Sequence, residues 1–226
     1  MATITHEPQG EGESKPTASP RAPKAHFSLV RDFTLADFIT LGNAASGTGS
    51  VLAVMHHLVS RDPLPLWIAF ALLPIALVLD YLDGRVARWR RQSSPLGAHL
   101  DSLSDSISFG VAPAALAFAV GMRGGWDALV LIYFVACGVS RLARYNATSA
   151  AMSDETGKVR YFEGTPIPSS LLLVAVLALL TFFGRTLDTM PFGVWSLGPF
   201  DLHPLVLMYA LSGSAMVSKT LRIPKI

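Results

Sequence analysis

Six apolar stretches recur along the chain, and they constrain its fold more than any other feature. They cover residues 37–58, 66–88, 97–121, 126–148, 167–184 and 201–218. Several hold only about 12–17 strictly apolar residues, whereas a helix that crosses the hydrocarbon core of a bilayer needs roughly 20. Each of those becomes long enough only if its helix continues into the polar residues at its end. The pattern therefore predicts an all-α integral membrane protein with six transmembrane helices.

The composition agrees with a protein of the lipid bilayer. Of the 226 residues only 15% are charged, and the mean hydropathy is +0.44. Soluble domains carry about 25% charged residues. The net charge of +2 is too small to indicate a nucleic acid partner. Cys137 is the single cysteine, which excludes an intrachain disulfide and a thiolate metal cluster.

The first 26 residues differ from the rest of the chain. They are rich in Pro, Gly, Ser, Thr and Glu and hold almost no large apolar side chains. Such a segment does not bury enough surface to offset its ordering entropy, so we expect residues 1–26 to form a disordered cytoplasmic tail. Residues 27–36 favour a short interfacial helix that lies on the membrane. The membrane domain would then comprise residues 27–226.

The basic residues are distributed unevenly between the two sides of the predicted bundle. If the N-terminus is inside, only three of the 18 Lys and Arg residues fall in outer loops, namely Arg61, Arg123 and Arg185. This is a strong positive-inside signal. It predicts a multi-pass protein of the cytoplasmic (cell) membrane with both termini in the cytoplasm. The end of the second stretch, the start of the third and the end of the fourth then share the cytoplasmic side.

Four aspartates lie at these cytoplasmic helix ends. Asp80 and Asp83 are three residues apart, and Asp101 and Asp105 are four apart, with Gly97 one turn earlier. Each pair therefore shares one face of its helix. A loop of about eight residues joins the two helices, which makes them antiparallel neighbours. We expect both pairs to face one polar, metal-binding cavity that opens to the cytoplasmic side.

Carboxylates gathered at a low-dielectric site repel one another, so they either take up protons or hold cations. Ligand sets made only of oxygen favour Mg²⁺ or Mn²⁺ over zinc, and such ions commonly serve phosphate chemistry. Solvated capping of helix ends is the structural alternative. It suits Asp101 but not Asp80 and Asp83, which come late in their helix. A cation or proton relay in a transporter is the functional alternative.

The complete motif is Asp80-x2-Asp83-Gly84-x2-Ala87-Arg88-x8-Gly97-x3-Asp101-x3-Asp105. It resembles the signature of the CDP-alcohol phosphotransferases, integral membrane enzymes that make phospholipids, and it matches that signature at every position. The segments TLGNAASG, SFGVAPA, CGVSRLARYN and YFEGTPIPSS are similar to the phosphatidylserine synthase branch. The resemblance implies a six-helix domain in which L-serine attacks the β-phosphorus of CDP-diacylglycerol and CMP is released.

The resemblance also implies roles for the signature residues. The four aspartates would hold two divalent cations, Mg²⁺ or Mn²⁺, and Asp105 would also be the general base that accepts the hydroxyl proton. The nucleotide site would be shaped by Gly84, Ala87, Arg88 and Gly97. A homodimer is implied as well. The same chemistry with glycerol 3-phosphate, inositol phosphate or choline as the acceptor is the alternative.

Four polar side chains outside the signature are further candidates. Arg141 and Arg144, with Asn146 nearby, suit the serine carboxylate or lipid phosphates because the guanidinium group binds such anions bidentately; anchoring of the helix end is the alternative. Asn43 lies among small residues in the first stretch. A buried amide there needs a partner, which is either another helix or the nucleotide. No histidine pair has the spacing of metal ligands.

Overall fold

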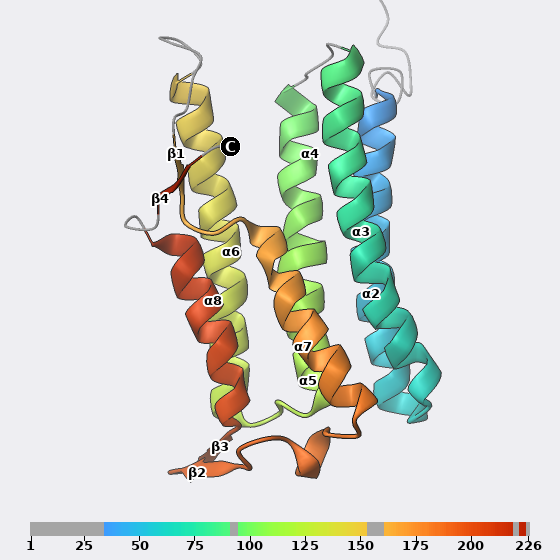
Figure 1. The fold of residues 1–226 in the computed structure, drawn as a ribbon, viewed down its shortest axis with the longest axis vertical. Helices are drawn as coiled ribbons and strands as arrows, with labels where there is room; N and C mark the ends of the chain where they lie inside the picture. The colour runs from blue at the N-terminus through green and yellow to red at the C-terminus, as the bar shows by residue number, and fades with distance from the viewer. Residues whose placement is uncertain (1–33, 91–94, 153–160, 219–221, 225–226) are drawn as a thin grey trace, which may run out of the picture. The chain divides into compact units, whose positions relative to one another are not determined.

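A computed structural model describes residues 34–90, 95–152, 161–218 and 222–224, and most of these residues are helical (Figure 1). The helices are α2 (Leu35–Ser60), α3 (Pro63–Arg90), α4 (Pro95–Asp105), α5 (Ala112–Val120), α6 (Gly125–Met152), α7 (Ser170–Phe182) and α8 (Leu207–Val217). The predicted tail, residues 1–26, lies outside the described residues, as do residues 27–33 of the predicted interfacial helix.

Each of the six predicted apolar stretches overlaps one continuous helical unit. Four units are long and apolar enough to cross a membrane: Leu35–Ser60, Pro63–Trp89, Leu96–Val120 and Gly125–Thr148. Two shorter apolar units, Ile167–Phe182 and Pro204–Val217, complete the set within the described residues. The prediction of a helical membrane protein is therefore confirmed.

Local sequence signals explain where the first helices begin and end. Thr34 and Asp37 form a capping box at the start of α2, in which the Asp37 carboxylate accepts a hydrogen bond from the Thr34 backbone N–H at 2.7 Å. Residues 35 and 36 therefore belong to α2. The helix ends at Ser60, and the capping residue Arg61 has a left-handed φ of 60°. Proline occupies the first position of both α3 and α4, where its missing N–H costs nothing.

The third apolar stretch is a single helical unit with a change of winding in its middle. A π-helix, Ser106–Val111, follows Asp105 directly and joins α4 to α5. Ser108, Phe109 and Gly110 are buried within it. Single turns of this kind occur mostly inside α-helices and often at functional sites.

Two short β-ladders depart from the all-α prediction. Strands β2 (Trp195–Leu197) and β3 (Phe200–Leu202) form an antiparallel hairpin, and β1 (Tyr161–Glu163) pairs with β4 (Arg222–Pro224). Gly198, with a φ of 67°, supplies the left-handed turn of the hairpin. The last apolar stretch thus begins as a strand at residue 201, and its helix starts later than predicted.

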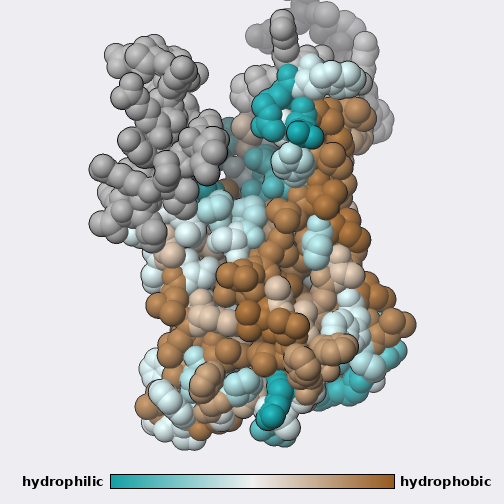
Figure 2. Space-filling model, in the orientation of Figure 1, coloured by the Kyte–Doolittle hydropathy of each residue, from teal (hydrophilic) through white to brown (hydrophobic). Residues whose placement is uncertain are grey.

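Helix α2 occupies a central place in the packing. It packs along α3 and also contacts α4, the π-helix and α5, while α6 packs against α8 and α5 against α7. The shared core contains fully buried side chains such as Leu73, Phe109, Leu116 and Tyr209. Outside this core, Figure 2 shows hydrophobic residues over the middle of the visible face and hydrophilic residues towards its ends. This is the pattern of a surface that contacts lipid.

Asp127 fastens the end of the bundle at which α6 begins. Its carboxylate accepts bonds from the backbone N–H groups of Gly124 and His203, both at 2.8 Å, and lies 2.6 Å from His203 Nδ1. The Asp127 residue is completely buried. The hairpin is attached close by, since Trp126 Nε1 donates to the Leu197 carbonyl at 2.9 Å. The start of α6 is thus fixed to the segment that leads into α8.

Candidate active site

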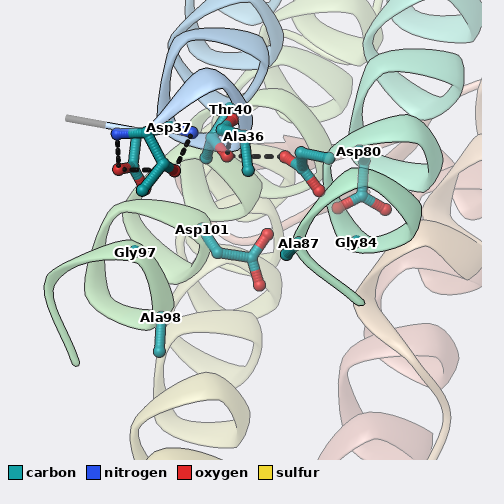
Figure 3. A pocket seen from close by; sticks show the side chains of 11 residues that line it. Ala36, Asp37, Thr40, Asp80, Gly84, Ala87, Gly97, Ala98 and Asp101 are labelled. Atoms are coloured by element: carbon teal, nitrogen blue, oxygen red, sulfur yellow. Dashed lines mark hydrogen bonds between the residues drawn. The ribbon is translucent and has the colours of Figure 1, made fainter. Parts of the chain in front are cut away.

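A pocket of about 310 Å³ lies between α2, α3 and α4, where α2 and α4 begin and α3 ends (Figure 3). Its walls come from Thr34, Ala36, Asp37, Thr40, Asp80, Asp83, Gly84, Ala87, Gly97, Ala98 and Asp101. Six of these residues are signature positions of the sequence motif. Residues that are distant along the chain therefore meet in one cavity, because α2 packs against both α3 and α4.

Three carboxylates converge at this pocket. Asp80 on α3, and Asp101 and Asp105 on α4, each offer one oxygen atom, and these atoms lie within 4.8 Å of one another. Asp80 and Asp101 line the pocket from facing helices (Figure 3). Asp105 lies one helical turn further into the bundle and is 7% exposed. The spacing of four residues places Asp101 and Asp105 on the same face of α4.

Asp83 lines the same pocket but does not belong to this group of three oxygen atoms. Its Oδ2 atom accepts a hydrogen bond of 2.7 Å from the Thr40 hydroxyl on α2. Both residues are buried, with 6% of Asp83 and 4% of Thr40 exposed. The four aspartates are thus divided into a cluster of three and a fourth that is held by α2.

Asn43 lies beside Asp105 beneath the pocket. Its Nδ2 atom donates to Asp105 Oδ1 at 3.3 Å, and its backbone carbonyl accepts a bond of 2.9 Å from the Ser108 hydroxyl in the π-helix. Asn43 is fully buried and is not among the residues that line the pocket. Of the two partners considered for this amide, the structure shows the one on another helix.

The donor set fits a hard divalent cation. Three carboxylate oxygens at mutual distances within 4.8 Å are the ligands that Mg²⁺ and Mn²⁺ prefer. Within the described ranges, no lysine or arginine forms an ion pair with any of the four aspartates. Clustered negative charge at membrane depth is costly without a compensating cation. The site is therefore chemically suited to bind one.

The glycine and alanine positions of the signature keep the pocket wall free of long side chains. At Gly84 an added Cβ would meet only the Arg88 guanidinium, 3.6 Å away. Ala87 and Gly97 line the pocket directly. Arg88 itself borders an adjacent surface hollow together with Arg85 and neighbouring residues of α3. The small residues thus leave space beside the carboxylates for a ligand to approach the backbone.

The three candidates on α6 have different surroundings. Arg144 Nη2 donates to the Val217 carbonyl at the end of α8 at 3.3 Å, and Asn146 Nδ2 donates to the Ser102 hydroxyl of α4 at 2.8 Å. The half-buried Arg141 has its Cζ atom 5.8 Å from the centre of the Tyr145 ring. Among the described residues no hydrogen bond or ion pair holds its guanidinium, while its charge interacts with that of Asp105. Arg141 is thus the member of the trio whose guanidinium is available.

The sequence interpretation missed the hydroxyl groups around the aspartates. Thr40 contacts Asp83, and Ser104 Oγ donates to the Thr40 carbonyl at 3.1 Å. A signal was present, because Thr40, Asn43 and Gly47 follow a spacing of three and four residues. That spacing places them on one face of an otherwise apolar helix. In an apolar helix such small polar residues also occur as ordinary packing residues, so the spacing alone does not identify their partners.

Comparison with known proteins agrees with this geometry. The family model for CDP-alcohol phosphatidyltransferases matches residues 33–202. A CDP-diacylglycerol–serine O-phosphatidyltransferase of Saccharomyces cerevisiae is 42% identical over 203 residues, which are 88% of this chain and 74% of the yeast protein.

Proteins of the same name from two other organisms are also similar. The one from Mycobacterium tuberculosis is 38% identical over 58% of this chain and 44% of its own length. The one from Methanocaldococcus jannaschii is 34% identical over 66% and 62%. The chain thus spans less than two thirds of the length of either. Since the matched family region covers most of the chain and includes all the signature residues, the chain belongs to the CDP-alcohol phosphatidyltransferase family.

Proposed function

We propose that the protein transfers the phosphatidyl group of CDP-diacylglycerol to the hydroxyl of L-serine, giving phosphatidylserine and CMP. Family membership supplies the reaction class. Serine as the acceptor is supported by the names of the similar proteins, above all by the yeast protein that matches most of the chain. The observation that carries the proposal is the meeting of Asp80, Asp101 and Asp105 beside a pocket lined by Gly84 and Gly97.

The four aspartates would hold two divalent cations, Mg²⁺ or Mn²⁺. The cluster of Asp80, Asp101 and Asp105 provides oxygen atoms from two helices, and Asp83 adds a carboxylate from the same pocket wall. When bound, such ions neutralise the charge of the phosphoryl oxygens and of the departing CMP. The protein contributes the fixed placement of its carboxylates on packed helices.

Asp105 is the general base in this proposal. The serine oxygen forms a bond to the β-phosphorus of CDP-diacylglycerol, and the bond from that phosphorus to the bridging oxygen breaks. CMP leaves with the electron pair of the broken bond. The proton of the serine hydroxyl passes to the Asp105 carboxylate, because a primary alcohol is a poor nucleophile at neutral pH. Asn43 acts on this step through its bond to Asp105.

The substrates would occupy different sides of the carboxylate cluster. Gly84, Ala87 and Gly97 give the nucleotide access to the pocket, with Arg88 at its edge. Arg141 would receive the carboxylate of serine or a lipid phosphate, since its planar fork suits such anions. Arg144 and Asn146 would support this anion site by fastening α6 to α8 and α4.

The topology completes the proposal. The units Ile167–Phe182 and Pro204–Val217 would be the fifth and sixth spans of a domain that comprises residues 27–226. Arginines of the pocket end, such as Arg85 and Arg141, would lie in the cytoplasm together with both termini. The pocket would then open to the cytoplasm, where serine is available. A homodimer in the cell membrane belongs to the same proposal.

A CMP-release assay tests the function. Purified protein receives labelled CDP-diacylglycerol, Mn²⁺ or Mg²⁺, and one of L-serine, glycerol 3-phosphate, inositol phosphate or choline. We expect metal-dependent CMP release with serine and a labelled product that comigrates with phosphatidylserine. Product with another alcohol but none with serine would overturn the acceptor. No CMP release with any alcohol would overturn the transfer itself, and cation flux into proteoliposomes would then test the transporter alternative.

A further inference from the structure

The buried face of α2 carries polar residues along a helix that is otherwise suited to lipid. Thr40 and Asn43 lie on this face, three residues apart, and each makes the same two kinds of contact. The side chain of each donates to an aspartate, Asp83 or Asp105, at 2.7 and 3.3 Å. The backbone carbonyls of both residues accept a hydroxyl hydrogen bond at 3.1 and 2.9 Å, from Ser104 and Ser108 respectively. Helix α2 thus contacts the signature residues of both neighbouring helices.

Thr40 carries the stronger of the two side-chain contacts. Its hydroxyl has one hydrogen to donate and two acceptors within reach, Asp83 Oδ2 at 2.7 Å and the Ala36 carbonyl at 3.0 Å. The contact to the carboxylate is the shorter one, and charge-assisted bonds are roughly twice as strong as neutral ones. The hydroxyl therefore holds Asp83. Water has little access to replace this hydroxyl as the donor to Asp83, because both side chains are buried.

The helix that carries Thr40 is itself fixed against α4 and the π-helix. Ser104 binds the Thr40 carbonyl, and about two turns further along α2 an added Cβ at Gly47 would come within 2.7 Å of the Ser108 Cα atom. So close an approach of backbones leaves α2 little freedom to shift. Through these contacts Thr40 fixes the position of the Asp83 carboxylate relative to α4, which carries Asp101 and Asp105.

We propose that Thr40 is a positioning residue for the phosphatidyl transfer, which holds Asp83 in the orientation that faces the pocket. This inference rests on the proposed function of the site. Asp83 lies outside the cluster of three oxygen atoms. It can therefore bind a metal ion only while its carboxylate is held facing the pocket. Residues that orient a metal ligand in this way typically contribute about 10–100-fold to metal affinity or activity.

Substitution of Thr40 by valine tests the inference, because valine keeps the shape of the side chain and removes the hydroxyl. Mn²⁺ binding is measured by calorimetry on purified protein without substrates. For Thr40→Val we expect affinity to fall about 10-fold or more, and for Thr40→Ser, which retains a hydroxyl, to stay within about 3-fold of wild type. Thr48→Val is the matched control, since Thr48 is exposed on the same helix; its affinity should not change.

A double-mutant cycle separates positioning from a general structural effect. If Thr40 acts through Asp83, adding Thr40→Val to Asp83→Asn should weaken Mn²⁺ binding no further. Losses that multiply would overturn the inference, as would wild-type affinity in Thr40→Val. Thr40→Ala takes the place of the valine variant if that variant does not fold. Because this measurement needs no serine, a failure of the wild-type protein to release CMP would reject the proposed function and leave the positioning result readable.

Discussion

Asn43 donates its side-chain hydrogen bond to Asp105 at 3.3 Å, in a region where Asn43 is fully buried and Asp105 is 7% exposed. The amide engages Oδ1 of the carboxylate. The Asn43 Oδ1 atom has no partner among the described residues, which leaves the bond to Asp105 as the contact that the amide group makes. This bond restricts the orientation of the Asp105 carboxylate.

The first prediction concerns Asp105 as the base. Asp105→Asn retains an oxygen that can accept from Asn43, but an amide does not take up the hydroxyl proton. We expect CMP release to fall by about 10²–10⁴-fold, while Mn²⁺-dependent nucleotide binding persists. Steady-state rates and equilibrium binding of labelled CDP-diacylglycerol check this. Asp188→Asn, at an exposed position, is the control, and unchanged turnover in Asp105→Asn would remove the residue from this role.

The second prediction compares Gly47, where α2 meets the π-helix, with Gly84 in the pocket wall. An added Cβ at Gly47 meets the Ser108 backbone, whereas at Gly84 it meets only the flexible end of Arg88. Gly47→Ala should therefore lower the free energy of unfolding by about 1–3 kcal/mol through overpacking. Gly84→Ala should leave stability unchanged or slightly higher and raise the KM for CDP-diacylglycerol. Thermal unfolding and substrate kinetics separate the two outcomes, and equal loss of stability in both variants would contradict the prediction.

The third prediction distinguishes Arg141 from Arg144. Arg141→Ala should raise the KM for serine by about 10–100-fold, the loss expected for a charge-assisted bond to the substrate, with little change in melting temperature. Arg144→Ala should lower the melting temperature, because the Val217 carbonyl loses its donor, and leave the KM for serine near wild type. Serine titrations and thermal melts of both variants check this. A reversed pattern would assign the anion site to Arg144.

The fourth prediction concerns the other end of the bundle. Asp127→Ala removes the acceptor of three contacts and should cost at least about 2 kcal/mol of unfolding free energy. His203→Ala should cost less, because the His203 backbone N–H still donates to Asp127. Both variants should retain wild-type CMP release per folded molecule. A change in the KM for serine in either variant would contradict this prediction, because the contacts between Asp127 and His203 would then affect the active site.

The pattern of apolar residues predicted where the helices lie because burial and lipid exposure are averaged over many positions. The π-helix and the short strands depend on single contacts, and the sequence did not predict them. The residues of Ser106–Val111 carry no sequence signal for a π-helix. The hairpin that begins at Trp195–Leu197 depends on Gly198 adopting a left-handed φ. The linker between α3 and α4 is also shorter than predicted, since α3 reaches Arg90 and α4 begins at Pro95.

In the candidate site, too, some features could be predicted from the sequence and others could not. Fixed spacings predicted that the carboxylates of Asp80, Asp101 and Asp105 come together, because a helix repeats its faces at known intervals. The separation of Asp83 from their cluster was not predictable, since it depends on where the Thr40 hydroxyl on another helix lies. Likewise, Arg144 and Asn146 look like substrate ligands in the sequence, but Val217 and Ser102 become their partners only after the helices have packed.

The π-helix behind Asp105 has a consequence for how this helical unit presents its faces. Successive residues of an α-helix turn by about 100°, and a π-turn shifts that phase by accommodating extra residues. The segment before it keeps Asp101 and Asp105 turned to the pocket, while the segment after it follows its own phase and buries Leu116. The unit therefore consists of two segments whose faces differ in phase: one presents carboxylates, and the other packs into the core.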